Sequence, residues 1–144
     1  MADNYIKRIL EANVYDVAVE TPLSPAQFLS DRLSNTILIK REDEQPVYSF
    51  KCRGAYNCIS KKTPEELAKG VVTASAGNHA QGVALSAQKL GIKATIVMPR
   101  TTPEIKVASV RARGAKGMTD EGVIRGYENR IKELQEELAE MQEV

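Results

Sequence analysis

Tryptophan is absent from this chain of 144 residues, and tyrosine and phenylalanine together make up only 5% of it. Large aromatic surfaces for stacking on bases are therefore scarce, and a net charge of +1 gives no general attraction to nucleic acids or membranes. No apolar run approaches the roughly 18 residues of a membrane span, and the start MADNYIKRIL has no apolar secretion-signal core. We therefore expect a cytoplasmic protein without a nucleic-acid or membrane partner.

Cysteine is also scarce, with only Cys52 and Cys58 in the chain. On one predicted helix they would lie about 9 Å apart, which is too far for a disulfide. No metal-ligand spacing surrounds them, so the sequence indicates no metal site. We interpret both residues as small, buried or half-buried thiols in a reducing compartment.

The length is about that of one domain with a single core, and the hydrophobic fraction of 42% is typical of globular proteins. Two segments rich in β-branched residues, GVVTAS and KATIVMP, alternate with amphipathic segments that end at Gly91 and Gly114. This alternation predicts an α/β fold with a small parallel sheet flanked by helices. The other predicted elements are a helix over 4–12, a helix beginning at Ser24–Pro25, a strand ending at Lys40, a helix over 50–60, a helix beginning at Pro64 with a capping box of Thr63 and Glu66, and a helix beginning at Pro103 with Thr102 as its cap.

After Gly114 the pattern changes, because AKGMTDEG has no β-branched run and we expect no further strand there. Residues 119–144 carry a net charge of −5 and the other residues +6. Apolar residues recur at spacings of three and four, the seam of a coiled coil; they are Ile124, Tyr127, Ile131, Leu134, Leu138 and Met141. This C-terminal amphipathic helix either docks on its own domain, forms a homo-oligomer through the seam, or frays.

The segment TASAGNHAQG is the most informative for chemistry. A predicted strand ends at Thr73–Ala74, and Gly77 permits a tight turn before the next helix. Amide N–H groups at such a helix start can bind an anion, and a carboxylate is a suitable guest. His79 is the only histidine and is either a general base or a structural residue of the turn.

Four segments, KREDEQPVYSFKCRGAYN, VVTASAGNHAQGVA, LGIKATIVMP and TTPEIKVASVRARGA, resemble the N-terminal part of threonine dehydratases. These are pyridoxal-phosphate (PLP) enzymes of fold type II, with serine dehydratases and serine racemases as relatives. The resemblance covers roughly Tyr5 to Gly114. It implies that residues 1–47 are the family's large-domain arm and 48–114 its small domain, followed by an unrelated acidic, heptad-patterned helix over 115–144.

The resemblance also implies roles for individual residues. Lys51 would form the Schiff base with PLP, Phe50 would pack near the cofactor ring, and Asn78 would donate a hydrogen bond to its phenolic oxygen. The loop that receives the substrate carboxylate would consist of Ser75, Ala76, Gly77, Asn78 and His79. In the family, these sites convert L-threonine to 2-oxobutanoate and ammonia by α,β-elimination, a step in isoleucine biosynthesis, and Lys51 would move the α-proton.

The sequence also departs from the family pattern, because it has no later glycine-rich loop for the cofactor phosphate and no partner for the pyridine nitrogen. We therefore expect a truncated or engineered chain with weak or no turnover of L-threonine. The alternatives are a non-catalytic assembly module that oligomerises through the C-terminal helix, and an enzyme like the serine dehydratases or racemases that acts on L-serine. Polar residues at Glu44, Cys52, Cys58 and 60–62 are expected on surfaces that a further domain would cover.

Overall fold

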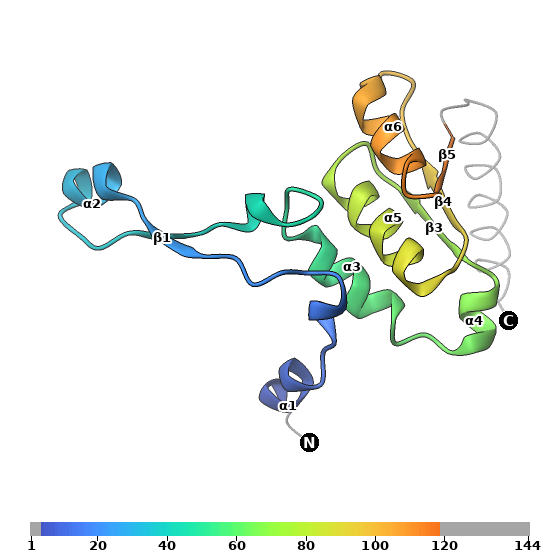
Figure 1. The fold of residues 1–144 in the computed structure, drawn as a ribbon, viewed down its shortest axis with the longest axis horizontal. Coiled ribbons are helices and arrows are strands. Elements are labelled where there is room, and N and C mark those ends of the chain that lie inside the picture. Colours follow the sequence, from blue (N-terminus) through green and yellow to red (C-terminus); the bar gives the residue numbers. More distant parts are fainter. Residues whose placement is uncertain (1–3, 119–144) are drawn as a thin grey trace, which may run out of the picture.

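Three short parallel strands form a sheet in the part of the chain that the computed structural model describes, residues 4–118 (Figure 1). The strands are β3 (Val71–Ala74), β4 (Ala94–Val97) and β5 (Lys116–Met118), in the order β3-β4-β5. Val71 pairs with Ala94, and Thr95 with Lys116. The small parallel sheet that the sequence predicts is therefore confirmed. The predicted coiled-coil seam, from Ile124 to Met141, lies outside the described residues.

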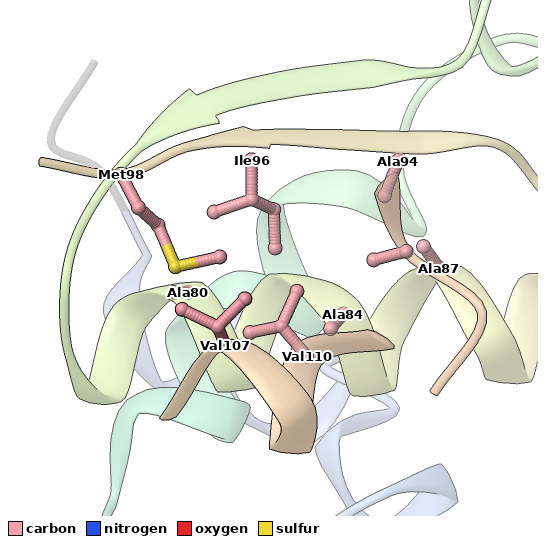
Figure 2. Packing of buried hydrophobic residues seen from close by; sticks show 9 residues of the cluster. Ala80, Ala84, Ala87, Ala94, Ile96, Met98, Val107 and Val110 are labelled. Atoms are coloured by element: carbon pink, nitrogen blue, oxygen red, sulfur yellow. The ribbon is translucent and has the colours of Figure 1, made fainter. Parts of the chain in front are cut away.

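Helices α5 (Asn78–Leu90) and α6 (Glu104–Arg111) cover one face of this sheet (Figure 2). Ile96 and Met98 are fully buried against Val107 and Val110 of α6 and against a row of alanines on α5. The small alanine side chains allow the helix to lie close to the strands, so that the aliphatic side chains fill the remaining space. This cluster is the main core of the described chain.

Helix α3 (Lys51–Ile59) packs along α5 on the side away from the sheet (Figure 1). Its buried residues Ala55 and Ile59 contact Val83 of α5, where small residues again allow a close approach. Helix α4 (Pro64–Ala68) follows, and its predicted capping box between Thr63 and Glu66 is present. No helix among residues 4–118 has both the length and the apolar character of a membrane-spanning segment.

Residues 4–47, which we call the arm, extend away from the sheet (Figure 1). They comprise α1 (Tyr5–Leu10), a 3-10 turn (Val14–Asp16), β1 (Leu23–Pro25), α2 (Gln27–Leu33), β2 (Leu38–Lys40) and a second 3-10 turn (Glu42–Glu44). Strands β1 and β2 pair antiparallel. The short helix predicted near the start and the strand predicted to end at Lys40 are both confirmed.

Two predicted helix starts are wrong. Pro25 ends strand β1 opposite Leu38, and α2 begins at Gln27. A two-stranded ribbon tolerates a proline at such a position, since its missing N–H removes little pairing. Thr102 does not cap α6: the N-cap is Pro103, and the Thr102 hydroxyl oxygen is buried without a hydrogen-bond partner in the described chain.

The expectation of no strand after Gly114 is also wrong, because Lys116–Met118 pairs with β4 as strand β5. Residues 116–118 are therefore strand rather than helix. Gly117 of this strand is closely packed, because a β-carbon there would lie 3.0 Å from Cε of Met98. Position beside a buried strand outweighs the low strand propensity of this segment.

Candidate functional site

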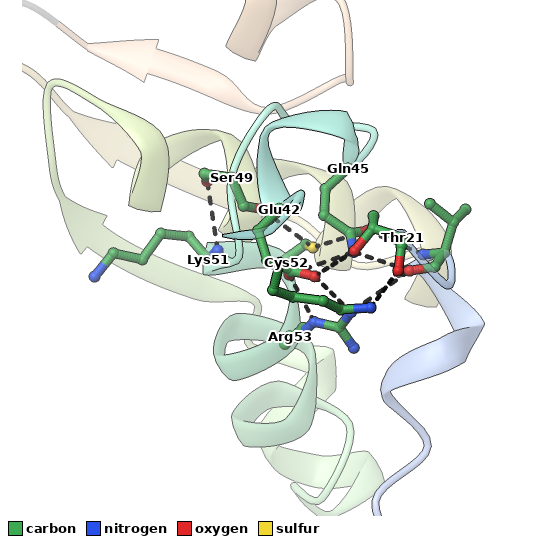
Figure 3. A network of polar contacts seen from close by, with 9 residues as sticks. Thr21, Glu42, Gln45, Ser49, Lys51, Cys52 and Arg53 are labelled. Atoms are coloured by element: carbon green, nitrogen blue, oxygen red, sulfur yellow. Dashed lines mark hydrogen bonds and ion pairs between the residues drawn. The ribbon is translucent and has the colours of Figure 1, made fainter. Parts of the chain in front are cut away.

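Lys51 is the first residue of α3, and its side chain is exposed. Phe50 precedes the helix and is 58% exposed, and the Lys51 ammonium nitrogen lies 5.2 Å from the centre of its ring. The amide N–H of Lys51 donates to the hydroxyl oxygen of Ser49 at 3.4 Å. Figure 3 shows the lysine side chain pointing away from the neighbouring polar network. Its amino group is therefore accessible to a reactant.

The 75–79 loop connects β3 to α5. The Ser75 N–H donates to the carbonyl of Val97 at 3.0 Å, which extends the strand pairing by one residue. The Ser75 hydroxyl oxygen accepts from the N–H groups of Gly77 and Ala80, each at 3.3 Å. Ser75 therefore caps α5 from outside the helix and fixes the shape of the loop.

Three amide N–H groups of this loop have no acceptor among residues 4–118, namely those of Ala76, Asn78 and His79. Asn78 and His79 are the first two residues of α5, a helix of 13 residues, and their side chains are exposed. Unpaired donors at the positive end of a helix suit a carboxylate. The two roles considered for His79 stay open, since its side chain makes no hydrogen bond within the described residues.

Lys51 and the 75–79 loop are held near each other by the packing of α3 on α5. A β-carbon on Gly82, one turn after Asn78, would lie 2.9 Å from the carbonyl oxygen of Lys51 and 3.2 Å from the backbone nitrogen of Cys52. Only glycine permits this approach without a backbone shift. The structure thus packs the backbone of Lys51 against α5 one turn beyond the 75–79 loop, at a residue that sequence reasoning did not single out.

Lys106 of α6 is a second residue that the sequence did not single out. Its ammonium nitrogen lies 4.0 Å from the position that a β-carbon on Gly77 would take. The side chain is half-buried and makes no ion pair within the described part of the chain. It adds a positive charge beside the free amides of the loop, and only the packing of α6 beside α5 reveals this proximity.

A polar network joins Arg53 of α3 to the arm (Figure 3). Arg53 donates to both carboxylate oxygens of Glu42, at 2.8 and 2.9 Å, and the Thr21 hydroxyl donates to the same carboxylate at 2.9 Å. These hydrogen bonds, above all those from Arg53, lower the pKa of Glu42 to about 2. Gln45 joins the network by donating to the Val19 carbonyl and accepting from the Val19 N–H, both at 2.9 Å.

Cys52 lies fully buried behind Lys51, and its desolvation raises the pKa of the thiol. The interpretation as a small buried thiol is therefore confirmed for Cys52, and the expectation that Cys52 lies on a surface left for another domain is wrong. Cys58 is exposed, so its interpretation as a buried or half-buried thiol is wrong, whereas a surface position was expected for it in the comparison with the family pattern. Both cysteines are free, as their spacing on one helix predicts. Tyr56 of the same helix donates to Asp16 at 2.6 Å, which raises the pKa of Tyr56 to about 12.

Comparison with known proteins gives one family and a consistent set of relatives. The sequence model of the pyridoxal-phosphate dependent enzymes matches residues 14–143, so the match continues through the segment that the heptad pattern assigns to a separate tail. The L-threonine dehydratase of Burkholderia multivorans is 60% identical over 115 residues, 80% of this chain and 23% of the relative. Threonine dehydratase 1 of Solanum lycopersicum is 61% identical over 111 residues, 77% of this chain and 18% of the relative. The chain thus spans about a fifth of the length of these curated relatives.

Solved structures agree with the sequence relatives. The processed form of threonine deaminase isoform 2 from Solanum lycopersicum superimposes with a TM-score of 0.76 at 59% identity, over 81% of this chain and 32% of that one. Maize serine racemase superimposes with a TM-score of 0.77 at 36% identity, over 92% of this chain and 41% of that one. The α/β fold, the accessible lysine and the loop with free amides therefore occur together in a chain that belongs to the family of pyridoxal-phosphate dependent enzymes.

Proposed function

We propose that these residues supply the cofactor lysine and the substrate loop of a PLP-dependent dehydratase that acts on L-threonine. The observation that carries this proposal is the placement of an accessible lysine amine at the start of α3, against the helix whose first turn has three unpaired amides. The identity of about 60% to biosynthetic threonine dehydratases supports threonine as the substrate. L-Serine, which lacks only the methyl group, is the alternative substrate.

The residues present match the chemical groups of the cofactor that they would contact. Lys51 offers a primary amine for the cofactor aldehyde, and Phe50 beside it offers an apolar ring face. The side chain of Asn78, at the first position of α5, is free to donate to the phenolic oxygen of the cofactor. When bound, PLP withdraws electrons from the substrate Cα, which makes the α-proton more acidic.

The 75–79 loop would bind the substrate carboxylate. The amides of Ala76, Asn78 and His79 can donate to its oxygens without losing an existing hydrogen bond, and α5 adds its positive dipole. Lys106 would add a full positive charge beside Gly77. A carboxylate fixed in this way would hold the substrate in one orientation at the start of α5, the helix against which the Lys51 backbone packs.

Lys51 would move the proton once its amine is free. Its ε-amino group would act as the general base at the substrate Cα, and the accessible side chain has the freedom that this movement needs. The β-hydroxyl would leave as water in the same elimination, and hydrolysis of the resulting enamine by water would give 2-oxobutanoate and ammonia from L-threonine. We expect turnover by these 144 residues to be weak or absent, since their sequence has no second glycine-rich loop for the cofactor phosphate.

The test is chemical trapping of the cofactor on its lysine. The protein is incubated with PLP, reduced with borohydride, digested and analysed by mass spectrometry. We expect modification of Lys51 well above that of the other lysines, and its loss in Lys51→Ala. Lys61→Ala is the matched control, because Lys61 is an exposed lysine just after the same helix.

Equal modification of Lys51 and Lys61 in the wild-type protein would contradict the proposal, since it would show only the general reactivity of surface amines with an aldehyde. The trapping is informative without turnover, because it reports the first bond that the site must form. Release of 2-oxobutanoate from L-threonine, compared with pyruvate from L-serine, then distinguishes the two substrates.

A further inference from the structure

Arg113, which follows α6, joins the segment before Lys51 to α6 itself. One terminal nitrogen of its guanidinium group, Nη2, donates to the carbonyl oxygen of Pro46 at 3.2 Å. The other, Nη1, donates to the carbonyl and the hydroxyl oxygens of Ser109, at 2.8 and 2.9 Å. The planar guanidinium group thus joins the segment at Pro46 to the end of α6, two segments that lie 67 positions apart in the sequence.

The chain of hydrogen bonds continues into the helix that begins at the 75–79 loop. The Ser109 hydroxyl accepts from Arg113 and donates to the side-chain oxygen of Gln81 at 3.3 Å. Gln81 lies in the first turn of α5, where its N–H donates to the carbonyl of Gly77. Pro46, Arg113, Ser109 and Gln81 therefore form one bridge across three segments.

Pro46 belongs to a tight turn of residues 45–48, which we call the lysine turn. The turn is closed by the Tyr48 N–H, which donates to the carbonyl of Gln45 at 2.7 Å, and Tyr48 has a positive φ of 55°. A non-glycine residue in this left-handed region is strained and persists only where its surroundings hold it. The direction in which the chain leaves this turn, through Ser49 and Phe50, determines where Lys51 begins α3.

The body of α3 is fixed on α5 by the close approach at Gly82 and by the packing of Ala55 and Ile59 on Val83. These contacts lie at Lys51 and beyond it, and none of them involves the turn that precedes the lysine. The bridge through Arg113 attaches this turn to α6 and, through Ser109 and Gln81, to the first turn of α5. A difference of about 1 Å in the placement of a reacting group has a large effect on rate, so the attachment of this turn bears on the site.

We propose that Arg113 is a positioning residue, which sets the orientation of the lysine turn relative to the first turn of α5 and so the placement of Lys51 relative to the 75–79 loop. The inference rests on the proposed function, because this placement matters for chemistry only if Lys51 holds PLP. The hydrogen-bonded bridge itself is open to a test without cofactor, so the two ideas can fail separately.

The first experiment is amide hydrogen exchange of the full chain without PLP. Arg113→Met removes the donors and keeps much of the side-chain length. We expect exchange of the Tyr48 amide to become about five-fold faster, the ratio that corresponds to the loss of one hydrogen bond, at unchanged exchange in β4. Gln81→Leu, which cuts the far end of the bridge, should accelerate the Tyr48 amide in the same direction.

The matched control is Arg111→Met, because Arg111 is the last residue of the helix that Arg113 follows, is largely exposed, and within residues 4–118 has an ion pair with Glu104 alone, at 3.6 Å. It should leave the Tyr48 amide unchanged. The inference is overturned if Arg113→Met does not accelerate this amide, if Arg111→Met does so equally, or if Gln81→Leu has no effect on it.

The second experiment asks whether the bridge acts on Lys51. With PLP below saturation, we expect Arg113→Met to lower the trapped fraction of Lys51 about five-fold at an unchanged melting temperature, and Arg113→Lys to restore part of it. An unchanged trapped fraction overturns the positioning role. If the wild-type protein does not take up PLP at Lys51 at all, the proposed function is overturned, and with it any effect of Arg113 on chemistry. The hydrogen-exchange result then still decides whether the bridge holds the turn.

Discussion

The α/β unit of residues 51–118 and the arm of residues 4–47 hold their secondary structure by different means. In the α/β unit, Ile96 and Met98 are fully buried in a cluster that joins the sheet to two helices. In the arm, α2 has no buried residue, and Phe28 and Leu33 are 77% and 59% exposed. Regular helices and strands therefore do not by themselves indicate a core: the arm has the hydrogen-bonded elements without the burial that usually stabilises them.

The arm is attached where it meets α3, through a small apolar cluster and a polar network. Val17 and Ala18 of the arm pack on Cys52 and Tyr56 of α3. Beside them, the Glu42 carboxylate accepts both hydrogen bonds from Arg53 of the helix. The comparison predicts that the same substitution lowers the free energy of unfolding by different amounts in the two regions. It also predicts that the arm can be loosened from α3 without unfolding the sheet.

The largest expected difference comes from the same substitution made in both regions. Ile96 of β4 is fully buried and Ile39 of β2 is 45% exposed. Ile96→Ala leaves a cavity among packed side chains and should lower the free energy of unfolding by about 3 kcal/mol. Ile39→Ala should cost about 1 kcal/mol or less, mostly from lost strand propensity. Urea denaturation of both variants measures the difference.

Similar costs for the two variants would contradict the comparison, because they would place Ile39 in an environment as apolar and as closely packed as that of Ile96. The slope of the denaturation curve is the control. A slope equal to that of the wild-type protein shows that each variant unfolds the same surface, so that the midpoints can be compared.

Much of the α/β unit follows from sequence pattern, for local reasons. Strands β3 and β4 are short runs rich in β-branched residues, and the helix after each strand carries a start or stop signal such as Gly91. Strand β5 could not be predicted from local preference, because Gly117 suits its position through close packing: Met98 occupies the space that a β-carbon there would need. Pro25 is similar, since its place in β1 depends on pairing with Leu38.

The candidate site divides in the same way. Motif resemblance predicts Lys51 and the 75–79 loop, and the structure places them on packed helices, although their roles stay predictions. Lys106 and Arg113 could not be found from local sequence, because each matters through contact with a segment far away in the chain. A basic residue on or just after a helix is most often a solvated charge, and only tertiary packing distinguishes these two.

A second prediction concerns the pH dependence of the attachment. The pKa of Glu42 is about 2, below its ordinary value of 4.5, so the folded protein favours the carboxylate. This stabilisation is fully present above pH 4.5 and is lost as the pH falls toward 2. This pKa shift corresponds to about 3 kcal/mol of the free energy of unfolding. Because the side chains of Glu42 and Arg53 are partly exposed, solvent screening reduces this contribution to about 1–2 kcal/mol.

The variant Glu42→Gln tests whether the charge of Glu42 stabilises the folded protein more at higher pH. It should be less stable than the wild-type protein at pH 6, and the difference should shrink as the pH approaches 2. Exchange of the Val19 amide, which donates to Gln45 in the same network, is a local measure of the loss. Glu20→Gln is the control, because Glu20 is exposed in the arm and has no ion pair within residues 4–118. A wild-type–variant difference that is constant with pH would contradict the role of the Glu42 charge.

The smallest expected effect concerns the reactivity of the two thiols of α3. Cys58 is exposed, whereas Cys52 is fully buried under Val17 and Ala18 of the arm, with a raised thiol pKa. A thiol reagent should therefore modify Cys58 at the rate of a free thiol and Cys52 at least about ten-fold more slowly. Mass spectrometry of the two peptides over time measures both rates in one sample.

Loosening the attachment should change only one of these rates. In Glu42→Gln, Cys52 should react a few-fold faster, because the arm that covers it opens more often, while the rate at Cys58 stays the same. Equal rates for the two cysteines in the wild-type protein would show that the arm does not protect Cys52. Faster amide hydrogen exchange throughout α3 in the variant would show that α3 itself opens, and would place the network within the α/β unit rather than between that unit and the arm.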